Sequence, residues 1–204
     1  QLCRKAGLPY MQIVMVTPHS HYPDPDEAAL RWQVFTSLAY GVRGISYFTY
    51  WTPRPWQGIG LERGGIITPD GERTLHYDMV KRINGEIQAL APTLMKLNSM
   101  GCYHTAPVPQ GCRELNCLAP VRSVSGGVML LGWFQDEKGR DYLFPVNRAP
   151  DVPIQVALEL RNPKRRANRI SKQTGRLESP PVHMHEGRLE LNLAAGDGEL
   201  LRLT

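Results

Sequence analysis

The sequence predicts an α/β segment followed by an all-β segment, specifically a partial (β/α) barrel and then an antiparallel β-sandwich. Two apolar runs, at residues 8–18 and 44–53, are each followed by a stretch with helical periodicity, which indicates two consecutive β/α units. From residue 98 onward this periodicity ceases, and short apolar runs, several with period-two alternation, are separated by turn residues. We therefore divide the chain into residues 1–97 and residues 98–204.

The first unit begins with residues 8–18, a nearly continuous apolar run of the kind found in strands covered on both faces. A helix follows, because Asp24 can cap it, Pro25 suits its first position and Glu27 suits its third. Gly41 ends this helix. The predicted order of elements is therefore strand, helix, strand.

The second unit begins with the apolar and aromatic run 44–53, which leads into a loop rich in proline, tryptophan and glycine. Thr74 can cap the next helix, whose apolar residues recur at spacings of three and four: Met79, Ile83, Ile87, Leu90 and Leu94. Parallel β/α folds bind ligands beyond the carboxyl ends of their strands. Because residues 17–22 and 50–56 occupy those ends, we expect a ligand site there.

Residues 98–204 contain five apolar stretches that predict strands, at 128–134, 142–146, 154–160, 189–193 and 200–203. Glycine, asparagine, aspartate and proline supply the turns between them. About a hundred residues of short strands at this spacing favour an antiparallel sandwich.

The length of the chain limits this interpretation. A complete β/α barrel takes about 250 residues, whereas residues 1–97 hold only two of its units. Since the chain begins at Gln1, we expect either the carboxyl-terminal part of a longer protein or a reduced relative. No apolar stretch is long enough to cross a membrane, so no membrane partner is predicted.

Charge and cysteine content favour neither a nucleic-acid partner nor a metal site. Lysine and arginine number 24 against 19 aspartates and glutamates, with part of the excess at residues 164–166 and Arg169. This stretch follows a turn and lacks interleaved aromatic residues, which favours a solvated loop. The cysteines lack CxxC spacing, so we expect free or buried thiols, with a disulfide among the last three as the alternative: Cys3, Cys102, Cys112 and Cys117. No cofactor is predicted.

The segment 27–51 reads EAALRWQVFTSLAYGVRGISYFTYW. It resembles the segment that joins the last two strands in β/α-barrel glycoside hydrolases related to family-forty-two β-galactosidases, where a similar helix end precedes a strand ending in an aromatic residue. Residues 189–203 resemble the closing hairpin of the β-domain that often follows such barrels. The resemblance implies a glycoside hydrolase in which residues 8–18 form strand seven and residues 45–51 form strand eight.

The resemblance also implies a nucleophilic glutamate at the end of strand seven and a general acid/base on strand four. Residues 12–19 contain no carboxylate, and strand four lies outside the chain. Retaining hydrolysis needs two carboxyl groups about 5–5.5 Å apart. The catalytic residues are therefore unknown, and we expect a fragment or reduced form of a retaining glycosidase. The alternative is a non-catalytic carbohydrate-binding or structural remnant.

Aromatic residues at the end of the second strand are candidates for saccharide binding. Tyr50, Trp51 and Trp56 can present flat faces to the apolar side of a sugar ring while polar groups bind its hydroxyls. The alternative for each is packing at the barrel rim.

Three polar residues are further candidates. Glu62 resembles a sugar-binding glutamate in the loop after strand eight, although the family's histidine three residues later is Gly65 here. His19 and His21 follow strand seven and can line the pocket. A metal site would need further ligands, which the spacing does not supply.

Assembly follows from the incomplete barrel. Two parallel strands cannot close a barrel, so residues 10–16 and 45–50 would leave backbone groups and apolar side chains uncovered. Pairing with the sandwich, with a second copy of the chain or with a missing amino-terminal barrel segment would each cover them. We expect a homodimer for the isolated chain.

Overall fold

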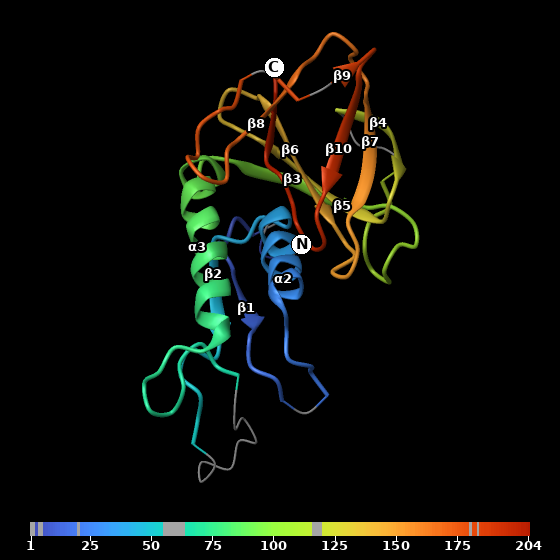
Figure 1. Cartoon of the computed structure of the whole chain (residues 1–204). Helices are drawn as coiled ribbons and strands as arrows, with labels where there is room; N and C mark the ends of the chain where they lie inside the picture. Colours follow the sequence, from blue (N-terminus) through green and yellow to red (C-terminus); the bar gives the residue numbers. More distant parts are fainter. Residues whose placement is uncertain are drawn as a thin grey trace.

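The computed structural model describes residue 3 and residues 6–19, 21–54, 64–115, 120–179, 181–182 and 184–204. The first elements are β1 (Met11–Met15), α2 (Glu27–Ala39), β2 (Gly44–Phe48) and α3 (Leu75–Leu94). Nine strands follow: β3 (Asn98–His104), β4 (Val121–Gly126), β5 (Met129–Gln135), β6 (Asp141–Asn147), β7 (Ile154–Leu160), β8 (Ala167–Arg169), β9 (Met184–His185), β10 (Arg188–Leu193) and β11 (Leu201–Leu203). An α/β segment therefore precedes a β segment, as predicted (Figure 1).

Strands β1 and β2 form a parallel sheet in which Met11 lies beside Gly44 and Met15 beside Phe48. Helix α2 connects the two strands, and α3 follows the second, which is the order that the sequence predicts. The sheet contains these two strands alone among the described residues. The described part of the chain therefore holds two β/α units and no closed barrel.

The start of α2 differs from the prediction. Asp26, and not Asp24, is the N-cap, and its carboxylate accepts a hydrogen bond from the Ala29 N–H at 2.8 Å. Asp24 instead lies 3.1 Å from Nε2 of His76 in the first turn of α3. The predicted end is confirmed, since Gly41 follows the C-cap with a φ of 88° that suits glycine.

Helix α3 begins after Thr74, as predicted, but the Thr74 hydroxyl does not cap it. That hydroxyl donates to the carbonyl oxygen of Gly65 at 2.7 Å and so ties the preceding loop to the helix start. The buried face of α3 includes Val80, Ile83 and Leu90, which recur at helical spacing.

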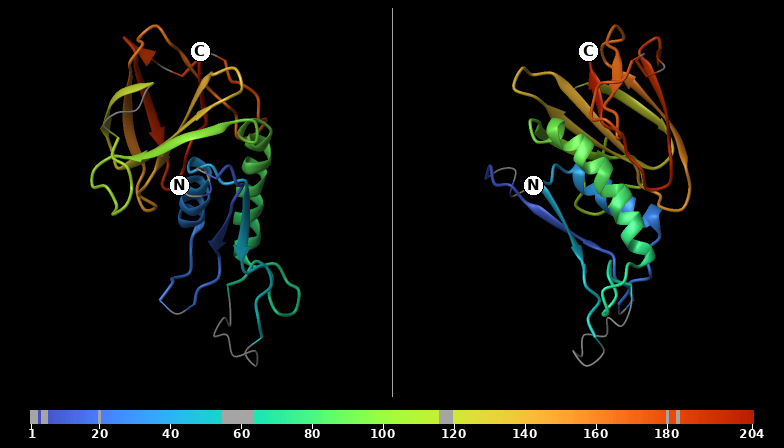
Figure 2. Two further views of the ribbon diagram at one scale, coloured as in Figure 1. Left: turned by 180° about the vertical axis from the view of Figure 1, so that it is seen from behind. Right: turned by 60° about the vertical axis from the view of Figure 1, so that its left-hand side comes forward.

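The two helices lie between the parallel sheet and an antiparallel sheet (Figure 2). One hydrophobic core crosses this layer and joins Val14 of β1, Phe35 of α2, Ile83 of α3 and Phe144 of β6. The Phe35 and Phe144 rings are 6.1 Å apart between centroids. This core spans the point near residue 97 where the architecture changes, and the division into residues 1–97 and 98–204 stays a prediction.

The β segment forms two antiparallel sheets. Their strand orders are β3-β5-β6-β11-β8 and β4-β7-β10-β9. A second core contains Leu131 and Leu143 from the first sheet and Leu158 and Leu191 from the second, so the sheets share buried side chains. The five predicted strands correspond to β5, β6, β7, β10 and β11, whereas β3, β4, β8 and β9 were not predicted.

Two glycines of the β segment allow it to approach helix α2 closely. A Cβ atom at Gly132 would lie 2.5 Å from the carbonyl oxygen of Ala39, in the last turn of α2. A Cβ atom at Gly196 would overlap the carbonyl oxygen of Ala28, in the first turn. Because real Cβ atoms do not approach this closely, both positions need glycine and both ends of α2 are held against the β segment.

The described cysteines, Cys3, Cys102 and Cys112, are free thiols, and Cys117 lies outside the described residues. Burial raises the pKa of Cys102 to about 12. None of the described helices combines the length and apolar character needed to span a membrane.

The basic stretch at residues 164–169 is partly neutralised within the fold. Arg165 lies 2.6 Å from a carboxylate oxygen of Asp141, and Arg169 lies 2.8 Å from one of Glu199. These arginines are therefore paired and half-buried, and less solvated than the sequence predicts.

Candidate site at the carboxyl ends of β1 and β2

Backbone and threonine hydrogen bonds join the carboxyl ends of β1 and β2. The N–H groups of Val16 and Thr17 both donate to the carbonyl oxygen of Phe48, at 2.9 and 3.1 Å. The buried Thr17 hydroxyl accepts from the Thr49 N–H at 2.9 Å. The segments that follow the two strands extend away from the antiparallel sheets (Figure 1). The fold therefore presents these two segments side by side on a fixed base.

Three aromatic rings gather above this base. The His19 ring lies 5.1 Å from the Tyr22 ring and 5.7 Å from the Phe48 ring, between centroids. Nδ1 of His19 lies 2.8 Å from the Thr17 carbonyl oxygen, which can only accept, so Nδ1 carries a hydrogen. In the neutral ring Nε2 is then an acceptor. We call His19, Tyr22 and Phe48 the rim cluster.

Tyr50 and Trp51 follow the rim cluster along the chain. Their side chains are 58% and 51% exposed. The Ile67 N–H donates to the Tyr50 carbonyl at 2.8 Å, and the Ile67 carbonyl accepts from the Thr52 N–H at 2.9 Å. The backbone beneath both rings is therefore fixed while the ring faces remain open to solvent.

Sequence reasoning selected His19, Tyr50 and Trp51 but missed Tyr22 and Phe48. Tyr22 lies in the predicted ligand-binding segment 17–22, but it is not among the predicted site residues. Phe48 lies on the same face of β2 as Ser46 and alternates with Tyr47, and this period-two pattern could have identified it as pointing away from the helices.

The remaining predicted residues are not brought into the site by the described structure. His21 is exposed in the segment after β1. Trp56 and Glu62 lie outside the described residues. No group of three potential metal ligands occurs among the residues that the structure describes.

The carboxylates nearest the strand ends already have partners. Asp26 caps α2, Asp24 contacts His76, and Asp70 lies 2.8 Å from Arg54. Thr17 occupies the end of β1, where the resemblance implies a nucleophile, and its hydroxyl is used in a structural hydrogen bond. Asp24, Asp26 and Asp70 therefore do not form a free carboxylate pair.

A pocket of about 480 Å³ adjoins the rim cluster. Tyr22 lines it together with Asp24 and Asp26, which precede α2. Ala29 in the first turn of α2 also lines it, as do Pro150 and Asp151 from the segment between β6 and β7. Tyr22 therefore connects the stacked rings to a cavity of small-ligand size.

No family profile matches this chain, and no curated protein matches it in sequence. Its structure is similar to that of an α-amylase from Anoxybacillus, described as providing insights into a new glycosyl hydrolase subclass, with a TM-score of 0.54 and 12% identity. The match covers 98% of this chain and 40% of the amylase chain, so this chain spans about two fifths of its neighbour. At 12% identity the similarity concerns the fold alone.

Two weaker similarities are also to carbohydrate-active enzymes. One is to Xyn30A, a glycoside hydrolase family 30 subfamily 8 xylanase from Clostridium acetobutylicum, with a TM-score of 0.42, 8% identity and coverage of 99% of this chain and 44% of the xylanase. The other is to a glucosidase from Croceicoccus marinus, with a TM-score of 0.28, 11% identity and coverage of 97% and 46%. Both scores are too low to define a shared fold.

Proposed function

We propose that this chain is a glycoside hydrolase-like protein that binds carbohydrate at the carboxyl ends of β1 and β2. The observation that carries the proposal is the set of open aromatic faces held on a fixed backbone: the rim cluster, Tyr50 and Trp51. The C–H face of a pyranose packs on such rings, and Nε2 of neutral His19 can accept a hydrogen bond from a sugar hydroxyl.

We also propose an architecture for the whole chain. We assign β1, α2, β2 and α3 to the last two units of a (β/α) barrel, and the two antiparallel sheets to a β-sandwich that follows it. The fold similarity to the α-amylase supports this assignment, and the sequence of residues 27–51 supports a relation to family-forty-two β-galactosidases. On this assignment the rim cluster lies at the end of the barrel where β/α barrels hold their active sites.

Binding without turnover is the second candidate function for residues 1–204. It is favoured by the carboxylates near the strand ends, since Asp24, Asp26 and Asp70 are each engaged elsewhere. A retaining glycosidase needs two carboxyl groups free to act as nucleophile and acid/base. We therefore separate saccharide binding, which the described residues can perform, from hydrolysis.

Calorimetric titration with neutral galactosides, glucosides and xylosides tests the binding site. Trp51→Ala and Tyr50→Ala should each weaken the binding of whichever saccharide binds by about threefold to tenfold, because one ring contact contributes about 0.5–1.5 kcal/mol. Met95→Ala is the matched control, since Met95 is 57% exposed but lies at the opposite end of α3. Equal affinity of all four proteins, or no binding of any saccharide, would refute the site.

A further inference from the structure

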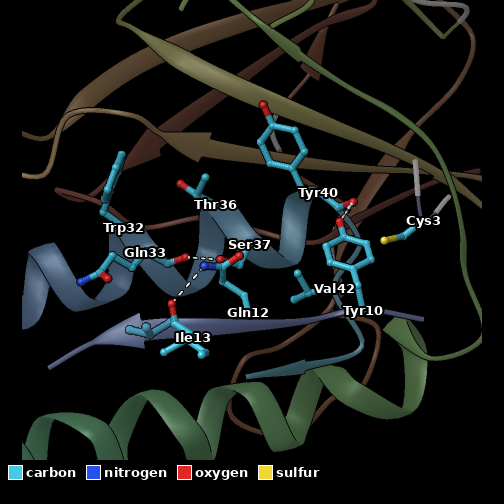
Figure 3. Close-up of a pocket in the computed structure, with 11 residues that line it drawn as sticks. Cys3, Tyr10, Gln12, Ile13, Trp32, Gln33, Thr36, Ser37, Tyr40 and Val42 are labelled. Atoms are coloured by element: carbon cyan, nitrogen blue, oxygen red, sulfur yellow. Dashed lines mark hydrogen bonds between the residues drawn. The ribbon is translucent and has the colours of Figure 1, made fainter. Parts of the chain in front are cut away.

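The outer edge of β1 and the adjoining face of α2 form a groove of about 610 Å³ (Figure 3). We call it the β1–α2 groove. Its lining includes Tyr10, Gln12 and Ile13 from the β1 side and Trp32, Thr36 and Tyr40 from the α2 side. It lies on the side of β1 that faces away from β2, and its described lining contains no aspartate, glutamate, lysine, arginine or histidine.

The backbone of β1 is open along this groove. Tyr10 accepts from the Arg43 N–H and Val16 donates to Phe48, so the even-numbered residues of β1 direct their backbone groups toward β2. Because alternate residues of a strand direct these groups to opposite sides, Met11, Ile13 and Met15 direct theirs into the groove.

Only part of this edge is closed by side chains. The side-chain amide of Gln33 forms two hydrogen bonds with the backbone of Met15. Its Oε1 accepts from the Met15 N–H at 2.9 Å, and its Nε2 donates to the Met15 carbonyl at 3.0 Å. The Ile13 carbonyl accepts from the exposed Gln12 side chain at 3.0 Å. Among the described residues, the Ile13 N–H and the Met11 backbone groups therefore have no partner, and they are available to a neighbouring strand.

The lining of the β1–α2 groove is better suited to contact with another polypeptide than to binding a polar ligand. The Tyr10 hydroxyl donates to the Tyr40 carbonyl at 2.5 Å, the Ser37 hydroxyl donates to the Gln33 carbonyl at 2.6 Å, and the Tyr40 hydroxyl contacts His104 at 2.7 Å. The unpaired Nε1 of Trp32 is covered by protein atoms and cannot reach a ligand. What remains exposed is mainly carbon, as on surfaces that other polypeptide covers.

We propose that the β1–α2 groove binds one further β/α unit, whose strand runs parallel to β1 and whose helix packs against α2. One residue of that strand would sit between Met11 and Ile13, donating to the Met11 carbonyl and accepting from the Ile13 N–H. The existing helices lie on one face of the parallel sheet, and a right-handed crossover would place the added helix on that same face.

The source of this unit is the chain that precedes residue 1 in a longer gene product. Cys3 lines the groove, so the amino-terminal end of the described chain already lies at the site (Figure 3). The α-amylase that shares the fold carries a further 60% of its chain beyond the matched part, because the match covers 40% of it. The inference rests on the barrel assigned above but not on saccharide binding.

Amide hydrogen exchange tests the proposal on two proteins: residues 1–204, diluted to a concentration at which light scattering gives the monomer mass, and the gene product with its natural upstream sequence. The amides of Met11 and Ile13 should exchange at least about a hundredfold more slowly in the longer product, because strand pairing protects them. Ile13→Asp in the longer product should abolish this protection, whereas Met95→Asp should leave it intact, since Met95 is similarly exposed at the end of α3.

Three results would overturn the proposal. They are a gene product that begins at residue 1, equal exchange rates in the two proteins, and protection that appears only on dimerisation, which would make a second copy the occupant. Exchange in the unsubstituted proteins does not depend on the variants folding. Since no saccharide is present, failure here is distinguishable from failure of the calorimetric test.

Discussion

The Tyr40 hydroxyl lies 2.7 Å from Nε2 of His104, and this contact ties the end of α2 to strand β3. Arg148 lies 3.0 Å from the other ring nitrogen, Nδ1. Because a guanidinium can only donate, Nδ1 accepts, so Nε2 carries the hydrogen and donates to Tyr40. The neutral form of His104 therefore joins the α/β segment to the β segment.

Burial first, and then the positive charge of Arg148, lower the pKa of His104 below its ordinary value of about 6.5. The unfolded chain therefore binds a proton that the folded chain does not, in the pH range between the lowered pKa and 6.5. Stability should be complete above pH 6.5 and fall as the pH falls through this range, by at most about 1.4 kcal/mol per pH unit. Urea unfolding at pH 7.5 and 5.5 measures this, and His104→Gln should reduce the difference.

Among the ion-paired residues, Arg31 should be the one whose replacement lowers the stability of the fold most. Its guanidinium contacts Glu86 and Asp197 at 2.9 and 3.2 Å, and all three side chains are 17% exposed. Arg31→Ala would leave the partly buried Glu86 without its main partner and Asp197 with Lys172 alone, and it should lower the free energy of unfolding by about 3 kcal/mol. Arg82→Ala is the control, because Arg82 pairs with Glu27 in solvent and its removal should leave the urea midpoint almost unchanged.

Gly132→Ala should destabilise the protein by about 1–3 kcal/mol, because the new methyl group would overlap the carbonyl oxygen of Ala39 and force α2 away from the β segment. Gly85→Ala is the matched control. Gly85 lies within α3 with no atom within 4 Å of the added methyl group, so its replacement should stabilise the helix by up to about 1 kcal/mol. Thermal unfolding of both variants measures the contrast, and equal shifts would contradict the close approach at Gly132.

Residues 1–204 alone should not turn over aryl glycosides. The physical reason is that the carboxylates of Asp24, Asp26 and Asp70, near the strand ends, each have a protein partner and so do not form a free pair. Turnover measured with a panel of nitrophenyl glycosides should equal the buffer rate. Robust turnover that persists in Glu62→Gln would contradict the expected lack of turnover. It would also show that Glu62 does not replace a missing catalytic carboxylate.

The isolated 204-residue chain should form a dimer, because no residue that the structure describes covers the β1–α2 groove. Met11 and Ile13 are 68% and 59% exposed on β1. Light scattering at micromolar concentration should give twice the mass of the chain, and Ile13→Asp should give the monomer mass. Leu75→Asp is the control, since Leu75 is more exposed but lies away from the groove. A stable monomer of the unsubstituted chain would contradict the prediction.

The elements with strong local patterns were predictable. The apolar run at residues 8–18 contains β1, and the spacing from Met79 to Leu94 predicts α3, because burial of one face imposes its period on the sequence. Strand β4 was missed because most of its residues, such as Arg122 and Ser125, are exposed, so it carries little apolar pattern.

The sequence by itself determined that two β/α units precede a set of antiparallel strands, and that aromatic residues follow the second strand. Tertiary structure alone decided which groups meet. The pairing of Met15 with Phe48 brings the Phe48 ring to His19, and Asp24 was free to contact His76 because Asp26 takes the cap. Local sequence fixes which face of an element is buried, whereas contacts between residues some 30 or 50 positions apart depend on register and packing, which no local period encodes.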